Sequence, residues 1–142
     1  MKTVGVVGLG DMGSGLAKNL LKHGFNVQGA DLLPHRQEAF RAMGGQLADC
    51  PADVGRGADA VFVMVMTGEQ AKSVILAPDG LLATMAEGSA IVLSATIKPQ
   101  EARDIGAQMH GSGVDLIDSP VSGGFPGAQG GSLTLMAAAP PD

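Results

Sequence analysis

The sequence has few of the residues on which many protein functions depend. Its 142 residues include no Trp, no Tyr and a single Cys, Cys50. One Cys excludes a disulfide within the chain, which fits the reducing environment of the cytoplasm. The sequence has no C-x-x-C pair, and its three His residues are scattered. We therefore expect no metal site.

Positive charge and long apolar runs are also scarce. The 9 Lys and Arg residues face 14 Asp and Glu residues, so the net charge is −5. This acidic balance disfavours nucleic acid as a partner. The longest clean apolar run, Ala60–Met66, is far shorter than the roughly 18–20 residues of a membrane span. Asp11 interrupts the apolar N-terminus before a signal-peptide core forms. We therefore expect neither membrane insertion nor secretion.

Two further motifs are missing, while glycine and apolar residues are abundant. The absence of G-x-S-x-G and G-x-x-x-x-G-K sequences disfavours a serine hydrolase and a P-loop nucleotidase. Glycine occupies 22 positions, and hydrophobic residues make up 45% of the chain. That apolar content is enough to bury a core, which argues against disorder. The length suits one domain.

Strand-like apolar segments alternate with helix-like segments along the chain. Strands are expected at Thr3–Gly8, Asn26–Asp31, Gln46–Ala48, Ala60–Met66, Ala90–Ser94, Val114–Asp118 and Ser132–Ala137. Helices are expected at Met12–Gly24, Pro34–Met43, Pro51–Gly57, Glu69–Leu76 and Pro99–His110. The alternation predicts an α/β fold with a doubly wound, mostly parallel sheet and helices on both faces.

The first of these helices carries an apolar stripe. Met12, Leu16 and Leu20 recur at a spacing of four residues, and Lys18 and Lys22 lie on another face. In a doubly wound sheet, ligands bind beyond the carboxyl ends of the strands. The loops of interest are therefore residues 8–13, 31–36, 66–69, 94–98 and 118–128.

A G-x-G-x-x-G sequence at residues 8–13 joins the first expected strand to the first helix. In this pattern Gly8 permits a tight turn, Gly10 lets the backbone approach a pyrophosphate, and Gly13 allows close packing of helix on strand. Free N–H groups at the helix start then face the phosphates. Asp31 ends the next strand, 31 − 13 = 18 residues after Gly13, near the ~20-residue spacing of the acid that binds ribose hydroxyls. These features predict a Rossmann-type dinucleotide site.

Asp31 also bears on the choice of cofactor. A carboxylate beside the ribose 2′ position repels a 2′-phosphate, so NAD is favoured over NADP. Arg36 is the counter-evidence, because its cation could swing toward such a phosphate, although a capping or surface role is more common for this residue type. Asp11 would repel phosphate and is expected to be a helix cap or a solvated acid. A methyltransferase with the same fold also has a glycine-rich loop and an acid after the second strand.

Three segments resemble the β-hydroxyacid dehydrogenases, a family that includes 3-hydroxyisobutyrate dehydrogenase, tartronate semialdehyde reductase and L-threonate dehydrogenase. They are GLGDMGSGLAKNLLKHG at 8–24, SATIKP at 94–99 and DSPVSGGFPGAQGGSLTLM at 118–136. The third segment is the most specific, and it argues against the methyltransferase. The sequence SATI at residues 94–97 resembles the corresponding segment of the sugar-acid branch of the family, which contains L-threonate dehydrogenase.

The resemblance implies a role for particular residues. The residues implied to line the adenosine and pyrophosphate site are Gly8, Leu9, Gly10, Met12, Gly13 and Asp31. Val65 and Met66 match a Leu-Pro pair that lies against the cofactor, and Met66 in place of Pro is a departure from the family. Thr96 matches a hydroxyl contact near the nicotinamide ribose. The implied substrate-binding loop is Ser122, Gly123 and Gly124, where successive N–H groups can cradle a carboxylate.

The residue that the family uses for catalysis has no counterpart in this sequence. Hydride transfer from an alcohol requires a group that takes the hydroxyl proton. In the family this is a Lys in a G-x-x-x-K-x-x-N-type motif, and none of the five Lys residues here lies in that pattern. Lys98 is close to a site loop, but at a helix start we expect it to be solvated. Family members continue into a helical second domain that carries the catalytic Lys and most subunit contacts.

We therefore expect residues 1–142 to be the dinucleotide-binding domain of a longer, homo-oligomeric, NAD-dependent oxidoreductase, with the catalytic Lys beyond Asp142. The implied substrate is a small 3-hydroxy acid, including sugar acids such as threonate. The chain alone is expected to bind NAD with little or no turnover. The alternative is a non-catalytic NAD(H)-binding module that acts through a partner.

Overall fold

A computed structural model of the chain describes residues 3–94, 97–118, 121–122 and 134–135. The strands are β1 (Thr3–Val7), β2 (Asn26–Ala30), β3 (Gln46–Leu47), β4 (Ala60–Val63), β5 (Ala90–Leu93), β6 (Asp115–Asp118), β7 (Val121–Ser122) and β8 (Thr134–Leu135). The helices are α1 (Asp11–Lys22), α2 (Pro34–Ala42), α3 (Pro51–Gly55), α4 (Gly68–Leu76) and α5 (Pro99–Gln108), with a 3-10 turn, η1, at Leu81–Ala83.

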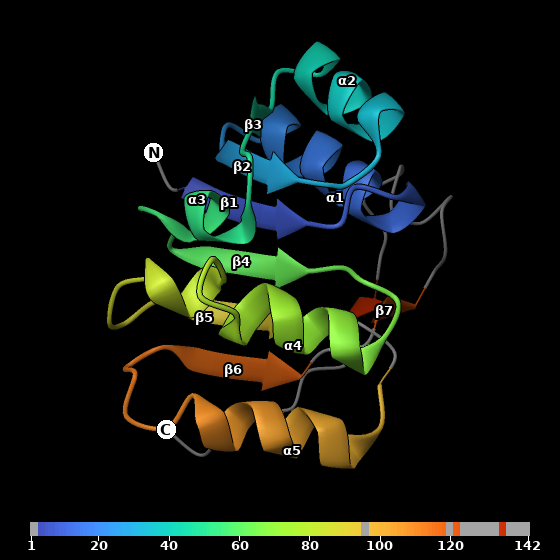
Figure 1. Cartoon of the computed structure of the whole chain (residues 1–142). Helices are drawn as coiled ribbons and strands as arrows, with labels where there is room; N and C mark the ends of the chain where they lie inside the picture. Colours follow the sequence, from blue (N-terminus) through green and yellow to red (C-terminus); the bar gives the residue numbers. More distant parts are fainter. Residues whose placement is uncertain (1–2, 95–96, 119–120, 123–133, 136–142) are drawn as a thin grey trace.

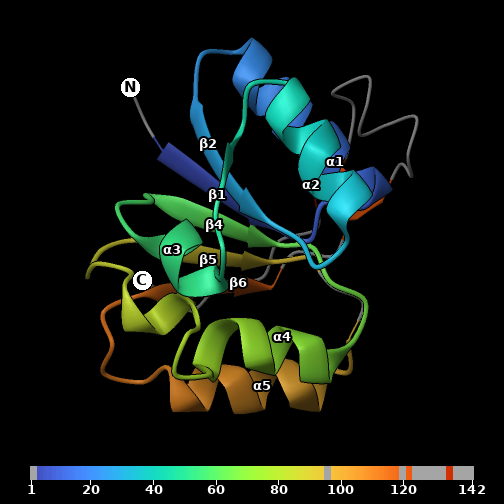
Figure 2. The same ribbon diagram turned by 45° about the horizontal axis from the view of Figure 1, so that its top comes forward.

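The main sheet has six strands in the order β3-β2-β1-β4-β5-β6, and every pairing in it is parallel (Figure 1). Helices α1 and α2 cover one face, and α3, α4 and α5 cover the other (Figure 2). Because both faces are covered, the central strands are almost continuously apolar. This architecture confirms the α/β, Rossmann-type prediction.

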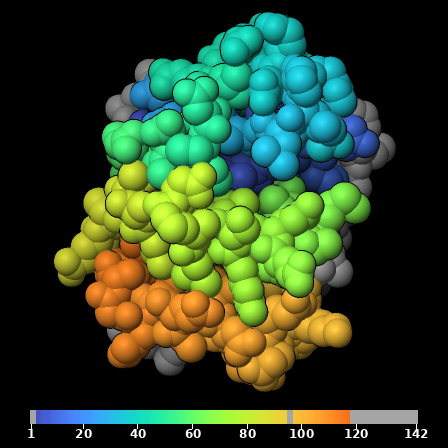
Figure 3. Space-filling model, viewed as in Figure 1, coloured from blue at the N-terminus to red at the C-terminus, as the bar shows by residue number. Residues whose placement is uncertain are grey.

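The strand order reverses between β1 and β4, whose following helices leave the sheet on opposite faces. Such a reversal opens a crevice at the carboxyl ends of the two strands. In the space-filling view, dark-blue N-terminal residues are visible between the cyan atoms of α2 and the green atoms of α4 (Figure 3). Part of the N-terminal segment is therefore accessible at the point where the topology predicts a ligand.

Two hydrophobic clusters hold the helices on the sheet. On the α3–α5 face, Val61 and Ile91 of the sheet pack in one cluster with Ile75 of α4 and Ile105 of α5, all fully buried. On the other face the fully buried Phe40 of α2 packs with Val6 and Val27.

The Phe40 ring lies directly on glycine backbone. A Cβ atom at Gly29 would lie 2.8 Å from the ring, and one at Gly45 would overlap it. The absence of side chains at Gly29 and Gly45 thus lets α2 approach β2 and the start of β3.

Helix α1 contacts the sheet differently from the expected stripe. Its buried residues are Gly13, Gly15 and Ala17, whereas Met12 and Leu16 are half-buried and Leu20 packs at the margin of its cluster. The helix starts so close to the end of β1 that only residues with little or no side chain fit between them.

The expected seventh strand, Ser132–Ala137, is observed as Thr134–Leu135. It pairs antiparallel with β7 in a separate two-stranded sheet, and does not extend the parallel sheet. Its partner, Val121–Ser122, is a two-residue strand, too short to show a period in the sequence. No helix in the described ranges is long and apolar enough to cross a membrane.

Candidate dinucleotide-binding site

The glycine loop after β1 is held tightly between its neighbours. Gly8 has a φ angle of +96°, which glycine adopts readily and other residues rarely do. Its N–H donates to the Ala30 carbonyl at 3.0 Å, and a Cβ there would overlap the Met64 carbonyl oxygen. A Cβ at Gly13 would overlap the carbonyl oxygen of Gly8. Both positions thus require glycine for steric reasons alone.

The N-terminus of α1 has hydrogen-bond donors that the helix itself does not use. The first helical bond runs from the Ser14 N–H to the Gly10 carbonyl at 2.8 Å, so the N–H groups of Asp11, Met12 and Gly13 have no acceptor within the helix. Gly10 is the N-cap residue and provides no side-chain cap. Uncapped donors at the positive end of a helix dipole suit an anion such as a diphosphate. Asp11 is exposed, in agreement with a solvated acid.

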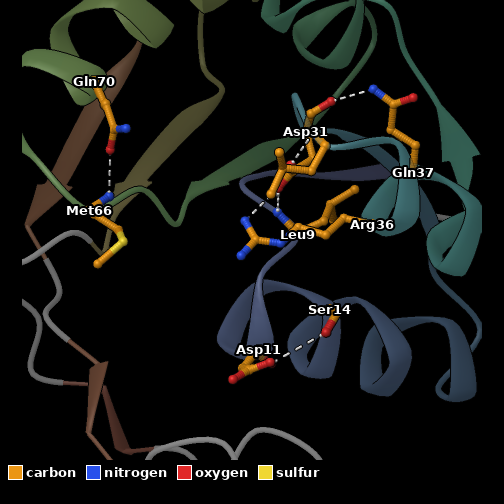
Figure 4. A network of polar contacts seen from close by, with 9 residues as sticks. Leu9, Asp11, Ser14, Asp31, Arg36, Gln37, Met66 and Gln70 are labelled. Carbon is orange, nitrogen blue, oxygen red and sulfur yellow. Dashed lines mark hydrogen bonds and ion pairs between the residues drawn. The ribbon is translucent and has the colours of Figure 1, made fainter.

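Asp31 is anchored to this loop by its carboxylate. The Asp31 side chain is only 6% exposed. Its Oδ2 accepts a hydrogen bond from the Leu9 N–H at 2.7 Å, and its Oδ1 accepts one from the Leu33 N–H at 2.9 Å. The Gln37 side chain donates to the Asp31 carbonyl at 2.6 Å (Figure 4). The end of β2 is therefore fixed against the glycine loop, with the acid facing that loop.

Leu9 contributes to this arrangement through its backbone. Its side chain is only 2% exposed and belongs to the cluster beneath α1 and α2. The Leu9 side chain therefore anchors the loop in the core, while the Leu9 N–H holds the Asp31 carboxylate.

Arg36, in the first turn of α2, lies beside Asp31 and not on the outer surface. Its Nη1 is 3.5 Å from the Asp31 Oδ2, and its side chain is 40% exposed (Figure 4). The sequence suggested a capping or surface role for this residue, but the structure places its charge in the candidate site. The reason is geometric, because Leu33 and Pro34 turn the chain so that the first turn of α2 returns toward β2.

A second loop, between β4 and α4, lies on the other side of the crevice. Gln70 Oε1 accepts hydrogen bonds from the N–H groups of Met66 at 2.9 Å and Thr67 at 3.1 Å (Figure 4). The Gln70 N–H donates in turn to the Thr67 hydroxyl at 3.1 Å. Val65 packs on the core, while Met66 is 85% exposed. Val65 thus anchors the loop and Met66 presents an apolar side chain to solvent.

Comparison with known proteins assigns this geometry to a family. The family model described as the NAD binding domain of 6-phosphogluconate dehydrogenase matches residues 3–142. The chain belongs to this family. It is thus an NAD-binding domain of the hydroxyacid dehydrogenase group, which confirms the cofactor and the resemblance predicted from the sequence.

Relatives of this NAD-binding domain are dehydrogenases. The chain is 37% identical over 139 residues to L-threonate dehydrogenase of Cupriavidus necator, covering 98% of the chain and 47% of that protein. It is 38% identical to NAD-dependent L-serine dehydrogenase of Pseudomonas aeruginosa, covering 96% of the chain and 46% of that protein. The crystal structure of 3-hydroxyisobutyrate dehydrogenase from Salmonella typhimurium superposes with a TM-score of 0.90 at 35% identity, over 96% of this chain and 48% of that one. The chain therefore spans about half the length of these relatives.

Within the NAD-binding domain, Gln70 is a site residue that our sequence reasoning missed. The signal was present, because Thr67 followed three residues later by Gln70 is a capping box, in which each residue satisfies a donor of the other. Its effect is to hold the loop that follows β4 and to occupy the N–H groups of Met66, Thr67 and Gln70. Helix α4 is thus capped, whereas α1 is not.

We expect Gln70→Ala to lower the free energy of unfolding by about 1 kcal/mol, the usual value of a helix cap. The substitution leaves the Met66 and Thr67 N–H groups without their acceptor, so the loop after β4 should also become more mobile. Thermal unfolding measures the first effect and amide hydrogen exchange at residues 66–67 the second. Gln100→Ala is the matched control, because the contacts that the structure describes for that side chain are with Asp104 and Arg103 on its own helix. Equal stability of the two variants would contradict this role.

The carboxyl end of β5 carries another residue that we missed. The Ser94 hydroxyl is buried and has no hydrogen-bond partner in the part of the chain that the structure describes. Buried hydroxyls are nearly always paired, so the Ser94 hydroxyl is a candidate for a polar contact at the carboxyl end of β5. Further along, the Lys98 N–H donates to Glu101 Oε1 at 3.0 Å. Lys98 is exposed, as expected.

Several expected site residues are not placed. Thr96, Gly123 and Gly124 lie outside the described residues, and Ser122 is described only as part of β7. Among the residues that are described, no group of three or more metal-ligating side chains occurs. A cavity of about 260 Å³ is present elsewhere, between the end of α5 and the start of β6. It lies at the opposite end of the sheet from the glycine loop, so it is separate from the coenzyme crevice.

Proposed function

We propose that residues 8–13 and Asp31 bind the adenosine diphosphate half of NAD. The observation that carries this proposal is the Asp31 carboxylate, locked to the Leu9 N–H at 2.7 Å beside an uncapped helix start. A diphosphate at the N–H groups of Asp11, Met12 and Gly13 would place the adjoining ribose near this acid. Asp31 would then accept hydrogen bonds from the ribose hydroxyls.

The remaining cofactor contacts follow the family resemblance. Val65 and Met66 would lie against the cofactor, on the loop that Gln70 holds in place. Thr96 would contact the nicotinamide ribose, and Ser122, Gly123 and Gly124 would bind a substrate carboxylate. The Ser94 hydroxyl, which is buried and has no partner among the described residues, supports a polar contact near the end of β5.

The proposed reaction is oxidation of a small 3-hydroxy acid, or reduction of the corresponding semialdehyde. NAD, when bound, supplies the hydride acceptor. The residues of this chain bind and orient the cofactor and the acid, and no Lys here lies in the motif from which the family takes its proton-transfer group. The names of the relatives favour short hydroxy acids, with threonate among them. We propose that the whole protein is a cytoplasmic homo-oligomer.

We expect the purified chain to bind NADH saturably but to reduce NAD with 3-hydroxy acids at no more than a trace rate. Because the chain has no Trp and no Tyr, NADH fluorescence can be titrated with little protein background. Absorbance of NADH then measures turnover with a panel including 3-hydroxyisobutyrate, threonate and serine.

The control ligand in this experiment is S-adenosylmethionine, which a methyltransferase with the same fold would bind. If the chain binds S-adenosylmethionine and does not bind NADH, the proposed function is contradicted. Turnover at enzymatic rates would contradict the expectation that proton transfer needs a residue absent from this chain. A longer form of the chain can be tested in the same way. If it also binds NADH without turnover, the alternative function is favoured, in which the protein is a non-catalytic NAD(H)-binding module.

A further inference from the structure

The guanidinium group of Arg36 lies between the two halves of the candidate site. On one side it faces the Asp31 carboxylate, with Nη1 3.5 Å from Oδ2. On the other side it covers Gly10, where a Cβ atom would lie 3.6 Å from each of Cζ, Nη1 and Nη2. Three equal distances place that point over the plane of the group. The guanidinium therefore lies flat against the glycine loop at the start of α1.

This position takes up acceptor capacity that a ribose would use. A carboxylate has about four lone-pair sites, and the N–H groups of Leu9 and Leu33 occupy one on each oxygen. Arg36 faces the remaining side of Oδ2, and the Asp31 side chain has only 6% of its surface left exposed. A ribose hydroxyl that hydrogen-bonds to this Oδ2 must therefore displace the guanidinium.

Displacing the Arg36 guanidinium from Asp31 costs little free energy, and it leaves the positive charge close to the ribose. The 3.5 Å separation exceeds that of a charge-assisted hydrogen bond, and the 40% exposed side chain can swing outward without unpacking the core. Among the residues that the structure describes, no other cationic side chain forms an ion pair with Asp31. What the displaced guanidinium then meets depends on the 2′ substituent of the ribose.

We propose that Arg36 is a specificity-determining residue that lets this domain accept NADP(H) beside NAD(H). In the free protein it neutralises Asp31. With NAD the ribose diol replaces it at the carboxylate, and with NADP it moves to the 2′-phosphate, where its planar fork can bind two phosphate oxygens. It thereby offsets the repulsion between Asp31 and that phosphate. This inference rests on the proposed placement of the adenosine ribose at Asp31.

The test is titration of NADH and NADPH into the unmutated chain, Arg36→Ala, Arg36→Lys and Arg41→Ala. Arg41 is the matched control, because it lies on the same helix and pairs only with exposed Glu38 among the described residues. We expect Arg36→Ala to raise the Kd for NADPH about tenfold, at the low end for a lost charge-assisted hydrogen bond. Its Kd for NADH should stay the same or fall, because the acid is no longer shielded. Arg36→Lys should be intermediate and Arg41→Ala unchanged.

The dependence of coenzyme binding on NaCl concentration is a second measurement. It would not change if Arg36 had only a structural role. A phosphate monoester carries a charge of about −1.5 to −2 at neutral pH, so NADPH binding to the unmutated chain should weaken more steeply with NaCl than NADH binding. Arg36→Ala should remove most of that difference. The inference is overturned if the unmutated chain binds NADH but not NADPH, or if Arg36→Ala changes both Kd values by one factor. Failure of the unmutated chain to bind NADH would overturn the proposed function itself.

Discussion

Replacing Asp31 with alanine is expected to weaken NADH binding about 100-fold. Each hydrogen bond from a ribose hydroxyl to a carboxylate contributes at least about 1.5 kcal/mol. At that lower limit two such bonds contribute about 3 kcal/mol, which corresponds to a factor of somewhat more than 100. NADPH binding should fall less or rise, because the substitution also removes the charge that repels the 2′-phosphate. The preference for NAD should therefore be lost, as titration with both coenzymes would show.

Two further variants separate recognition from folding in this experiment. Asp31→Ala leaves the Leu9 and Leu33 N–H groups without the acceptors seen in the structure, at a cost of about 1–3 kcal/mol in stability. Asp31→Asn keeps one side-chain oxygen and should retain more of the fold while still losing NAD preference. Asp104→Ala removes the same charge from α5, where Asp104 accepts from Gln100 at 2.8 Å, and should bind NADH normally. Unchanged NADH binding by a folded Asp31→Ala protein would refute the assignment of the ribose.

Replacing Gly13 with alanine is expected to lower the free energy of unfolding by about 3 kcal/mol, the upper range for overpacking a core. The new methyl group would overlap the backbone carbonyl oxygen of Gly8, and a backbone atom cannot turn away as a side chain can. Either α1 shifts away from β1 or the glycine loop distorts. The melting temperature should fall by about 10 °C, and NADH affinity should fall with it.

Gly106→Ala is the matched control for this effect. Gly106 also lies inside a helix, but among the described residues a Cβ there would meet only Leu116 Cδ2, at 3.6 Å, which is ordinary contact. Alanine is the better helix former by about 1 kcal/mol, so this variant should be more stable than the unmutated chain. If the same Gly→Ala substitution lowers the free energy of unfolding at position 13 and raises it at position 106, the difference is due to the close approach of α1 to β1. A Gly13→Ala protein as stable as Gly106→Ala would contradict the packing described here.

Features set by local pattern could be predicted from the sequence. The parallel sheet follows from apolar runs alternating with helical segments, and Gly8, Gly13 and Asp31 follow from the spacing of a nucleotide loop. Boundaries at Pro34 and Pro99 were also accurate, because Pro begins helices.

Features that depend on side chains meeting across the fold could not be predicted in this way. Arg36 and Asp31 are five residues apart, but only the turn before α2 decides that the guanidinium reaches the carboxylate. The small-residue face of α1 was hidden by the more obvious stripe of Met12, Leu16 and Leu20, since hydrophobicity does not report how close two backbones come. The pairing of β8 with β7 is likewise a tertiary choice.

The contact of Phe40 with Gly29 and Gly45 has a consequence for divergence among related sequences. A side chain at either glycine would occupy the space of the aromatic ring, so a larger residue at 29 or 45 is tolerable only where position 40 has become smaller. The three sites should accordingly change together during evolution, although they lie on β2, on α2 and directly before β3. A lineage that acquired alanine at position 45 first would pass through a less stable ancestor, which makes the reverse order, shrinkage of the ring before growth of the glycine, the more accessible path.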